Sequence, residues 1–257
     1  MSSSKTKTDA TSADAFLGGR IDIMQPRQGH RAGSDAVFLA AAVPASAKGK
    51  VLDAGAGVGV AGLCVLARIR GVKVTAVEID AKLCLLAGAN AARNGFAERF
   101  EVVNADVTLP AKKLAATGLE REGYDHVIAN PPFHVEGSVR AAPDRSKARA
   151  HVMRAGDLAA WIRFLAAMTT PKGWVTLIYP PEHLGPMLRE LDGRFGEVKI
   201  YPLFPKADVA AARVILQGRK GSRAAPKLLP GLVLHGAGGR YTKEAEDILR
   251  GGKALQF

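Results

Sequence analysis

Residues 50–59 read KVLDAGAGVG, a buried-strand pattern that runs directly into three alternating glycines. An apolar helical pattern follows at once, in residues 58–71. Glycine adopts backbone angles with φ > 0 and lets the main chain approach a ligand closely. A strand, a glycine turn and a helix in this order predict a ligand-binding turn at the carboxyl end of a strand in an α/β sheet.

The chain beyond this stretch alternates strand and helix patterns. Strand patterns lie at 72–80, 100–107, 124–133 and 173–180, and helical patterns lie at 81–95, 157–169 and 182–193. Such alternation predicts a parallel, doubly wound sheet with helices on both faces. Only five residues separate the last two strands, 197–205 and 211–220, so they should pair antiparallel. The predicted fold class is α/β and Rossmann-like, with a mostly parallel seven-stranded sheet and an antiparallel C-terminal hairpin.

Length and composition fit one large domain. The 257 residues are 47% hydrophobic and 23% charged, which excludes global disorder and a disulfide scaffold. The predicted parts are a disordered tail at 1–16, a hairpin and helix forming a lid at 17–48, the main domain at 49–220, and an extension of it at 221–257. Residues 34–35, Ser-Asp, are expected to cap the helix of the lid. The sequence holds neither a bilayer-spanning apolar run nor a signal-peptide pattern, so a cytoplasmic location is expected.

Positive charge is concentrated in the second half of the chain. The net charge is +12, and residues 140–257 hold 20 Lys and Arg against 10 Asp and Glu, whereas residues 1–139 hold 16 against 14. This asymmetry predicts a surface that faces a polyanion. The two cysteines, Cys64 and Cys84, lie in apolar helical patterns and are expected to be buried thiols. No metal site is expected, because His134 and His151 lack partners at metal-ligand spacing.

The glycine turn carries an acidic residue that favours a particular ligand. The spacing is Gly-x-Gly-x-Gly, and Asp53 stands two positions before the first glycine. A carboxylate there would repel the pyrophosphate of a dinucleotide, but it could accept a hydrogen bond from a protonated amine. These features favour S-adenosylmethionine, which has an α-amino group and no phosphate.

Two further strand ends complete a nucleoside site. Glu78 ends the second strand 19 residues after Gly59, where an acidic group can accept from both ribose hydroxyls. Asp106, in Asn104-Ala105-Asp106 at the end of the third strand, can accept from an adenine amino group. The backbone N–H of Val107 can donate to a ring nitrogen of the same base.

The fourth strand ends in Asn130-Pro131-Pro132-Phe133, a stiff turn that presents acceptors. The Asn130 side chain and the Pro131 carbonyl can accept the two N–H bonds of an exocyclic amine, where positive charge develops during methyl transfer. Phe133 can stack on an extruded base and hold its nitrogen in line with a methyl sulfonium. The motif therefore predicts transfer of a methyl group to an amino nitrogen on an aromatic base.

These residues resemble S-adenosylmethionine-dependent N-methyltransferases of class I that carry an Asn-Pro-Pro-aromatic motif. Residues 25–36, QPRQGHRAGSDA, resemble more narrowly the bacterial tRNA1(Val) adenine-N6 methyltransferases, in which a Gly-x-Arg-or-Lys-x-Gly-x-Asp element lies near the methionine end of the cofactor. Gly29, Arg31, Gly33 and Asp35 match that element. The resemblance implies N6 methylation of an adenine beside the anticodon of a tRNA.

The resemblance implies a set of site residues. The expected cofactor-binding residues are Arg31, Gly33, Asp35, Asp53, Ala54, Gly55, Gly57, Gly59, Glu78, Ile79, Asp106, Val107 and Asn130. The expected catalytic residues are Asn130, Pro131, Pro132 and Phe133. A basic stretch directly follows the motif, and Arg140, Arg145, Lys147 and Arg149 with Phe133 are expected to contact RNA. No membrane and no obligate protein partner are expected.

Two other functions remain open from the sequence. One is methylation of a protein glutamine amide, as in release-factor modifiers, which usually carry Tyr where Phe133 stands and bring a separate N-terminal helical domain; only about 50 residues precede Asp53. The other is non-enzymatic RNA binding on the same fold, against which Asn130 and Asp53 argue. An amino-methyltransferase acting on rRNA or DNA is a variant of the main hypothesis.

Overall fold

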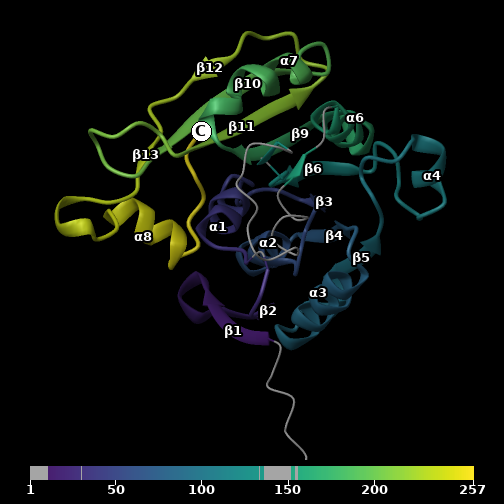
Figure 1. The fold of residues 1–257 in the computed structure, drawn as a ribbon, viewed down its shortest axis with the longest axis horizontal. Helices are drawn as coiled ribbons and strands as arrows, with labels where there is room; N and C mark the ends of the chain where they lie inside the picture. Colours follow the sequence, from purple (N-terminus) through teal and green to yellow (C-terminus); the bar gives the residue numbers. More distant parts are fainter. Residues whose placement is uncertain (1–10, 30, 133, 136–151, 154–155) are drawn as a thin grey trace, which may run out of the picture.

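A mixed sheet forms the centre of the computed structural model, which describes residues 11–29, 31–132, 134–135, 152–153 and 156–257 (Figure 1). Within these residues the sheet has nine strands. Its order is β12 (Lys227–Leu228), β10 (Phe195–Phe204), β11 (Arg213–Lys220), β9 (Thr169–Tyr179), β6 (Tyr124–Ala129), β3 (Gly49–Ala54), β4 (Val72–Glu78) and β5 (Phe100–Asn104), and β13 (Leu232–Val233) also pairs with β10.

The strand directions confirm the predicted fold class. β3, β4, β5, β6 and β9 run parallel, and β11 pairs antiparallel with both β9 and β10. The predicted number of seven strands is wrong by two, because residues of the C-terminal extension add β12 and β13 along β10. The tail that begins at Leu232 is expected from its sequence to hold a possible strand and a short helix, where β13 and α8 (Lys243–Leu249) lie, whereas β12 is too short to give a β pattern in the sequence.

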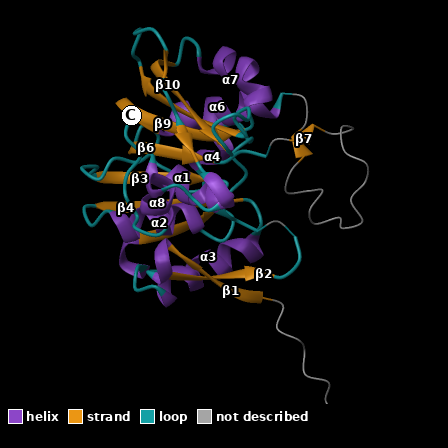
Figure 2. Ribbon diagram, turned by 90° about the vertical axis from the view of Figure 1, so that its left-hand side faces the viewer, coloured by secondary structure: helices purple, strands orange, loops and turns teal. Residues whose placement is uncertain are grey.

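Helices cover both faces of the sheet, as Figure 2 shows from the side. One apolar cluster contains residues of α1 (Ser34–Ala41), α2 (Val60–Arg68), α3 (Ala81–Arg93) and α8 (Lys243–Leu249). A second contains residues of α4 (Ala111–Ala115), α6 (Asp157–Met168) and α7 (Leu184–Leu191). Neighbouring residues of β3 enter different clusters, Val51 the first and Leu52 the second, because successive side chains of a strand point to opposite faces.

Short elements complete the described chain. Single 3₁₀ turns lie at η1 (Leu17–Gly19), η2 (Ala97–Arg99), η3 (Pro181–His183) and η4 (Ala237–Gly239). β7 (His134–Val135) and β8 (Val152–Met153) pair parallel as a separate two-stranded sheet. No helix of the described chain is both long and apolar enough to cross a membrane.

The N-terminal residues correct one prediction. Residues 11–16, expected in a disordered tail, form β1 (Thr11–Phe16), which pairs antiparallel with β2 (Ile21–Pro26). The order comes from β2, whose Ile21 and Ile23 are fully buried and supply the apolar anchor that β1 lacks. The first ten residues of the predicted tail lie outside the described residues.

Two smaller expectations are corrected as well. Ser34 and Asp35 do not cap α1; its N-cap is Gly33, which has no side chain to make a cap hydrogen bond. Cys64 is buried as expected, but Cys84 is only half-buried, since α3 presents that side of the helix to the edge of the sheet.

The C-terminal extension packs on the same body. α8 lies against α1, and the N–H of Leu255 donates to the Ala41 carbonyl at 2.9 Å. The Arg68 guanidinium at the end of α2 donates to the Gly252 carbonyl at 2.9 Å. The extension therefore stabilises α1 and α2, the helices before and after the glycine turn.

A buried polar cluster crosses the middle of the sheet. His126 on β6 is 4% exposed, and its Nε2 lies 2.8 Å from the Thr176 hydroxyl on β9. Gln217 on β11 donates to that hydroxyl and to the Ala42 carbonyl after α1. Burial lowers the pKa of His126 to about 3, so the imidazole is neutral in the folded protein.

Because His126 is buried in its neutral form, we expect the folded protein to lose stability as the pH falls. In the unfolded chain the imidazole has its ordinary pKa of 6.5 and binds a proton as the pH falls below that value, whereas the folded one resists until about pH 3. The contribution of His126 to the free energy of unfolding is therefore about 2 kcal/mol lower at pH 5 than at pH 7.5. Urea unfolding of His126→Gln should show a stability deficit that narrows by about that amount over this range.

The matched control is His235→Gln, which removes a half-exposed imidazole from the C-terminal extension. The stability deficit of His235→Gln should narrow less than that of His126→Gln, because of these two rings only that of His126 is buried. A deficit of His126→Gln that stays constant between pH 7.5 and 5 would show that the buried imidazole does not govern the acid limb.

Candidate active site

The parallel register brings the carboxyl ends of β3, β4, β5 and β6 together on one side of the sheet. Ala54, the last residue of β3, lies opposite Val77 of β4 and Ala129 of β6. Glu78, the last residue of β4, lies opposite Asn104 of β5. The glycine turn, the acidic strand end and the Asn-Pro-Pro turn, each distant in sequence, therefore begin side by side.

The shape of the glycine turn depends on positive φ angles, which glycine adopts readily, and on close packing against neighbouring side chains. Gly55, Gly57 and Gly59 have φ of 68°, 58° and 87°, values that favour glycine. A Cβ on Gly55 would lie 2.6 Å from the Trp161 ring of α6, and one on Gly59 would lie 2.9 Å from the Phe100 ring. Gly57 differs, because no heavy atom of the described residues lies within 4 Å of the Cβ position there. The first and third glycines of the turn are therefore closely packed, whereas the middle one, Gly57, faces open space.

The Glu78 carboxylate binds the backbone at the open glycine of the turn. Its residue is 8% exposed, and Oε2 accepts the Gly57 N–H at 2.8 Å while Oε1 accepts the Asp80 N–H at 3.0 Å. The carboxylate is held at the strand end that was predicted to meet a ribose. It also fixes the open part of the glycine turn.

Asp53 lies beneath the turn. It is 2% exposed, and its Oδ2 accepts the Gly62 N–H of α2 at 2.9 Å. Burial, with a smaller contribution from the charge of Glu78, raises the pKa of Asp53 to about 7. Its contact with α2 means that Asp53 stabilises the start of that helix, in addition to any contact with an amine.

The end of β4 presents an apolar side chain, and the end of β5 continues into a turn. Ile79, next to Glu78, is 64% exposed although it is large and apolar. Asp106 accepts from the Thr108 N–H at 2.8 Å and from its hydroxyl at 2.6 Å, and Val107 is buried. No role was predicted for Asn104, yet its amide donates to the carbonyls of Glu78 and Ile79, both at 2.9 Å. A polar amide at the end of a predicted strand was the available signal.

The Asn-Pro-Pro turn is anchored by a residue that the sequence patterns did not reveal. Asn130 is half-buried and directly follows β6, and Pro131 is buried. The Tyr179 hydroxyl, at the end of β9, donates to the Pro132 carbonyl at 2.9 Å. Tyr179 is 4% exposed, and burial raises its pKa to about 12, so it remains a donor at physiological pH. Phe133 lies outside the described residues.

The lid residues are bound within the protein. Arg31 forms an ion pair with Asp14 of β1 and donates to the Ser12 hydroxyl at 2.8 Å. Asp35 accepts from Arg213 of β11 at 2.8 Å, which joins α1 to the far half of the sheet. The Cβ position of Gly33 is open, with no heavy atom of the described chain within 4 Å. These contacts hold the segment 31–35 between the hairpin and the sheet.

The basic residues expected to contact RNA, Arg140, Arg145, Lys147 and Arg149, lie outside the described residues. A second basic cluster in the sequence, at 219–223, is used within the fold. Lys220 pairs with Glu122 at 2.8 Å, and the Arg219 guanidinium lies over the Trp174 ring at 5.7 Å from its centroid.

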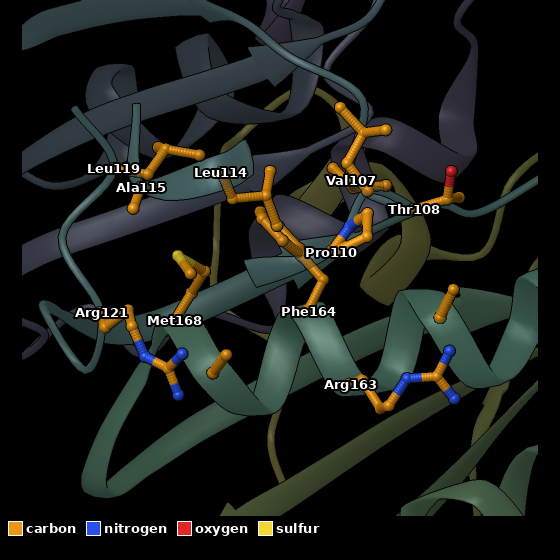
Figure 3. A pocket seen from close by; sticks show the side chains of 13 residues that line it. Val107, Thr108, Pro110, Leu114, Ala115, Leu119, Arg121, Arg163, Phe164 and Met168 are labelled. Carbon is orange, nitrogen blue, oxygen red and sulfur yellow. The ribbon is translucent and has the colours of Figure 1, made fainter. Parts of the chain in front are cut away.

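An apolar pocket lies beside the site. Its volume is about 350 Å³, and α6 and the 107–121 segment line it (Figure 3). Figure 3 shows Phe164 and Met168 rising from α6 toward Leu114 and Pro110. Val107 lines this pocket, whereas Gly57, Glu78 and Asn130 do not. The pocket therefore lies on the α4–α6 side of the Asp106 turn.

The fold and these strand ends define a Rossmann-like methyltransferase. The chain belongs to the methyltransferase small-domain family, whose model matches residues 31–160.

Relatives and solved structures agree with this class. A protein of Porphyromonas gingivalis named tRNA1(Val) (adenine(37)-N6)-methyltransferase is 29% identical over 90% of this chain and 91% of its own. One of Enterobacter sp. with the same name is 31% identical over 53% of this chain and 54% of its own. The crystal structure of a predicted O-methyltransferase from Agrobacterium tumefaciens is 30% identical, with a TM-score of 0.73 and coverage of 86% and 98%.

The strand ends fit S-adenosylmethionine, the methyl donor predicted from the sequence. The middle of the glycine turn faces open space where a ligand can lie against the backbone. Glu78 stands beside it with a carboxylate for the ribose, and the exposed Ile79 offers an apolar surface of the kind that an adenine ring covers. The carboxylate of Glu78 at the turn would repel a phosphate, which agrees with a nucleoside that carries none.

Removal of the Glu78 carboxylate should weaken cofactor binding strongly. Glu78→Ala would lose an ionic acceptor for the ribose and release the Gly57 N–H, so we expect the Kd of S-adenosylhomocysteine to rise about tenfold or more. Isothermal titration calorimetry measures this change. Glu101→Ala, which removes an exposed acid from β5, is the control; equal affinities for the two variants would contradict the assignment.

Tyr179→Phe tests the anchor of the Asn-Pro-Pro turn. Without the hydroxyl, the Pro132 carbonyl loses its donor, and we expect kcat to fall about tenfold while the Kd of S-adenosylhomocysteine is unchanged. Tyr201→Phe is the matched control, because Tyr201 is 4% exposed and lies on β10 against Phe257. The anchor role fails if both variants lose the same fraction of kcat.

Proposed function

We propose that this chain transfers a methyl group from S-adenosylmethionine to the N6 amine of an adenine in tRNA. The observation that carries the proposal is the position of Asn130 and Pro131: the turn starts next to the glycine turn in the sheet and is fixed by Tyr179. The names of the relatives, which are tRNA1(Val) adenine-N6 methyltransferases, support the choice of substrate.

The residues of the turn suit an amine that reacts poorly. Bound S-adenosylmethionine supplies an electrophilic methyl group. The Asn130 side-chain oxygen and the Pro131 carbonyl would accept the two N–H bonds of the adenine amine, where positive charge develops as the new N–C bond forms. No general base is required at that step, since the methylated nitrogen can release its proton to solvent afterwards.

Positioning follows from the same contacts. Pro131 and Pro132 lack backbone donors and have a fixed φ. The turn therefore keeps the Pro131 carbonyl directed at the substrate with little loss of entropy on binding. We infer that Phe133 stacks on the extruded base, and that Arg140, Arg145, Lys147 and Arg149 contact the flanking phosphates. An enzyme with this reaction on tRNA is expected in the cytoplasm.

The experiment is transfer of a labelled methyl group to unmodified tRNA, followed by mass spectrometry of the nucleosides. We expect N6-methyladenosine in tRNA, with valine tRNA as the first substrate to test. Asn130→Ala should reduce the rate at least about a hundredfold and raise the Kd of S-adenosylhomocysteine by a much smaller factor, because Asn130 acts mainly on the transition state.

Three outcomes would contradict the proposal. Label that survives RNase and remains on protein would indicate a glutamine amide as the substrate. Full activity of Asn130→Ala would exclude the turn as the catalytic element, and binding of RNA without transfer would favour a non-enzymatic role.

A further inference from the structure

Two asparagines, Asn90 of α3 and Asn94 at the C-cap of that helix, bind the outer edge of the N-terminal hairpin. Asn94 accepts the Asp22 N–H at 2.9 Å and donates to the Asp22 carbonyl at 2.8 Å. Asn90 does the same with Met24, accepting its N–H at 2.8 Å and donating to its carbonyl at 3.1 Å. Each amide thus pairs with the backbone of one residue, as a neighbouring strand would.

The spacing of the two asparagines explains how side chains of a helix can hydrogen-bond to the backbone of a strand. Four residues of an α-helix rise about 6.0 Å, and two residues of a strand rise about 6.7 Å. Asn90 and Asn94 are four apart along α3 and its C-cap, and Asp22 and Met24 are two apart on β2, with their N–H groups directed away from β1. The two amides therefore satisfy the free edge of the hairpin in register.

Asn90 alone extends this contact to the glycine turn. Its amide nitrogen also donates to the Val58 carbonyl at 3.0 Å, between Gly57 and Gly59. The Asn90 residue is fully buried, whereas the bonds of Asn94 to Asp22 lie at the surface. A buried amide with all of these partners has a fixed position, because each lost bond would leave a polar group unpaired.

The hairpin is joined to the segment 31–35 by a second buried amide. Gln25, next to Met24 on β2, is 2% exposed; it accepts the Ala32 N–H at 2.8 Å and donates to Asp14 at 2.7 Å. Contacts therefore run from the glycine turn through Asn90 to β2, and from β2 through Gln25 to the segment 31–35. Figure 1 shows the hairpin beside α3 at one end of the molecule.

We propose that Asn90 is a positioning residue for the cofactor, which holds the glycine turn and the hairpin in one arrangement through its bonds to Val58 and Met24. The inference rests on the proposed binding of S-adenosylmethionine at that turn. Asn90 does not contact the cofactor; it fixes the Val58 carbonyl and thereby the open backbone at Gly57.

Asn90→Ala and Asn94→Ala form a matched pair for the test. Both remove two bonds to β2, but only the first removes the bond to the glycine turn. We expect Asn90→Ala to raise the Kd of S-adenosylhomocysteine about tenfold, and Asn94→Ala to change it less than about twofold. With saturating cofactor, kcat of Asn90→Ala should approach the wild-type value while KM for S-adenosylmethionine is raised.

Hydrogen exchange of the Gly57 and Gly59 amides provides a readout that needs no ligand. These amides should exchange faster in Asn90→Ala than in Asn94→Ala. Where Asn90→Ala does not fold, Asn90→Leu fills nearly the same buried space without a charge and removes the donor to Val58, and it should show the same faster exchange and weaker binding.

The outcomes separate this inference from the proposed function. Equal affinity and equal exchange in the two alanine variants, with tight binding by the wild type, would overturn the role of Asn90 and leave the proposed function standing. Failure of the wild type itself to bind S-adenosylhomocysteine would overturn the proposed function, and the exchange experiment would still decide whether Asn90 fixes the turn.

Discussion

The hydrogen bond from the Gly57 N–H to the Glu78 carboxylate is the constraint on which the site depends. It joins the ends of β3 and β4 at the point where the backbone lies open to a ligand. The glycines on either side of Gly57 are closely packed, since a Cβ on Gly55 would meet the Trp161 ring and one on Gly59 the Phe100 ring. The carboxylate therefore has two functions, as a structural acceptor for the turn and as the predicted acceptor for a ribose.

Amide side chains extend this constraint to neighbouring parts of the site. Asn104 holds the ends of β4 and β5 together, and Asn90 joins the glycine turn to the hairpin. An amide suits such positions because it donates and accepts at once and carries no charge, so its burial costs less than that of a carboxylate. On the catalytic side the Tyr179 hydroxyl has the corresponding function at Pro132.

Much of the architecture could be predicted because local patterns and the sheet agree. The strands at β3, β4, β5, β6 and β9 and the antiparallel pair β10–β11 follow from buried runs and short connections. The predictions failed where order comes from a distant partner. β1 has few apolar residues and is ordered by β2, and β12 is a two-residue strand that pairs along the edge of β10.

The sequence by itself determined the element order, the positive-φ glycines and the identity of the residues at the strand ends, because each depends on local backbone preference and on burial of alternating side chains. Only the tertiary structure decided what those residues bind. Asp53 meets α2, Arg31 meets Asp14, and Tyr179 meets a carbonyl 47 residues away. Partners of this kind are separated widely along the chain, and side-chain direction and packing, which local patterns do not encode, bring them within hydrogen-bond distance.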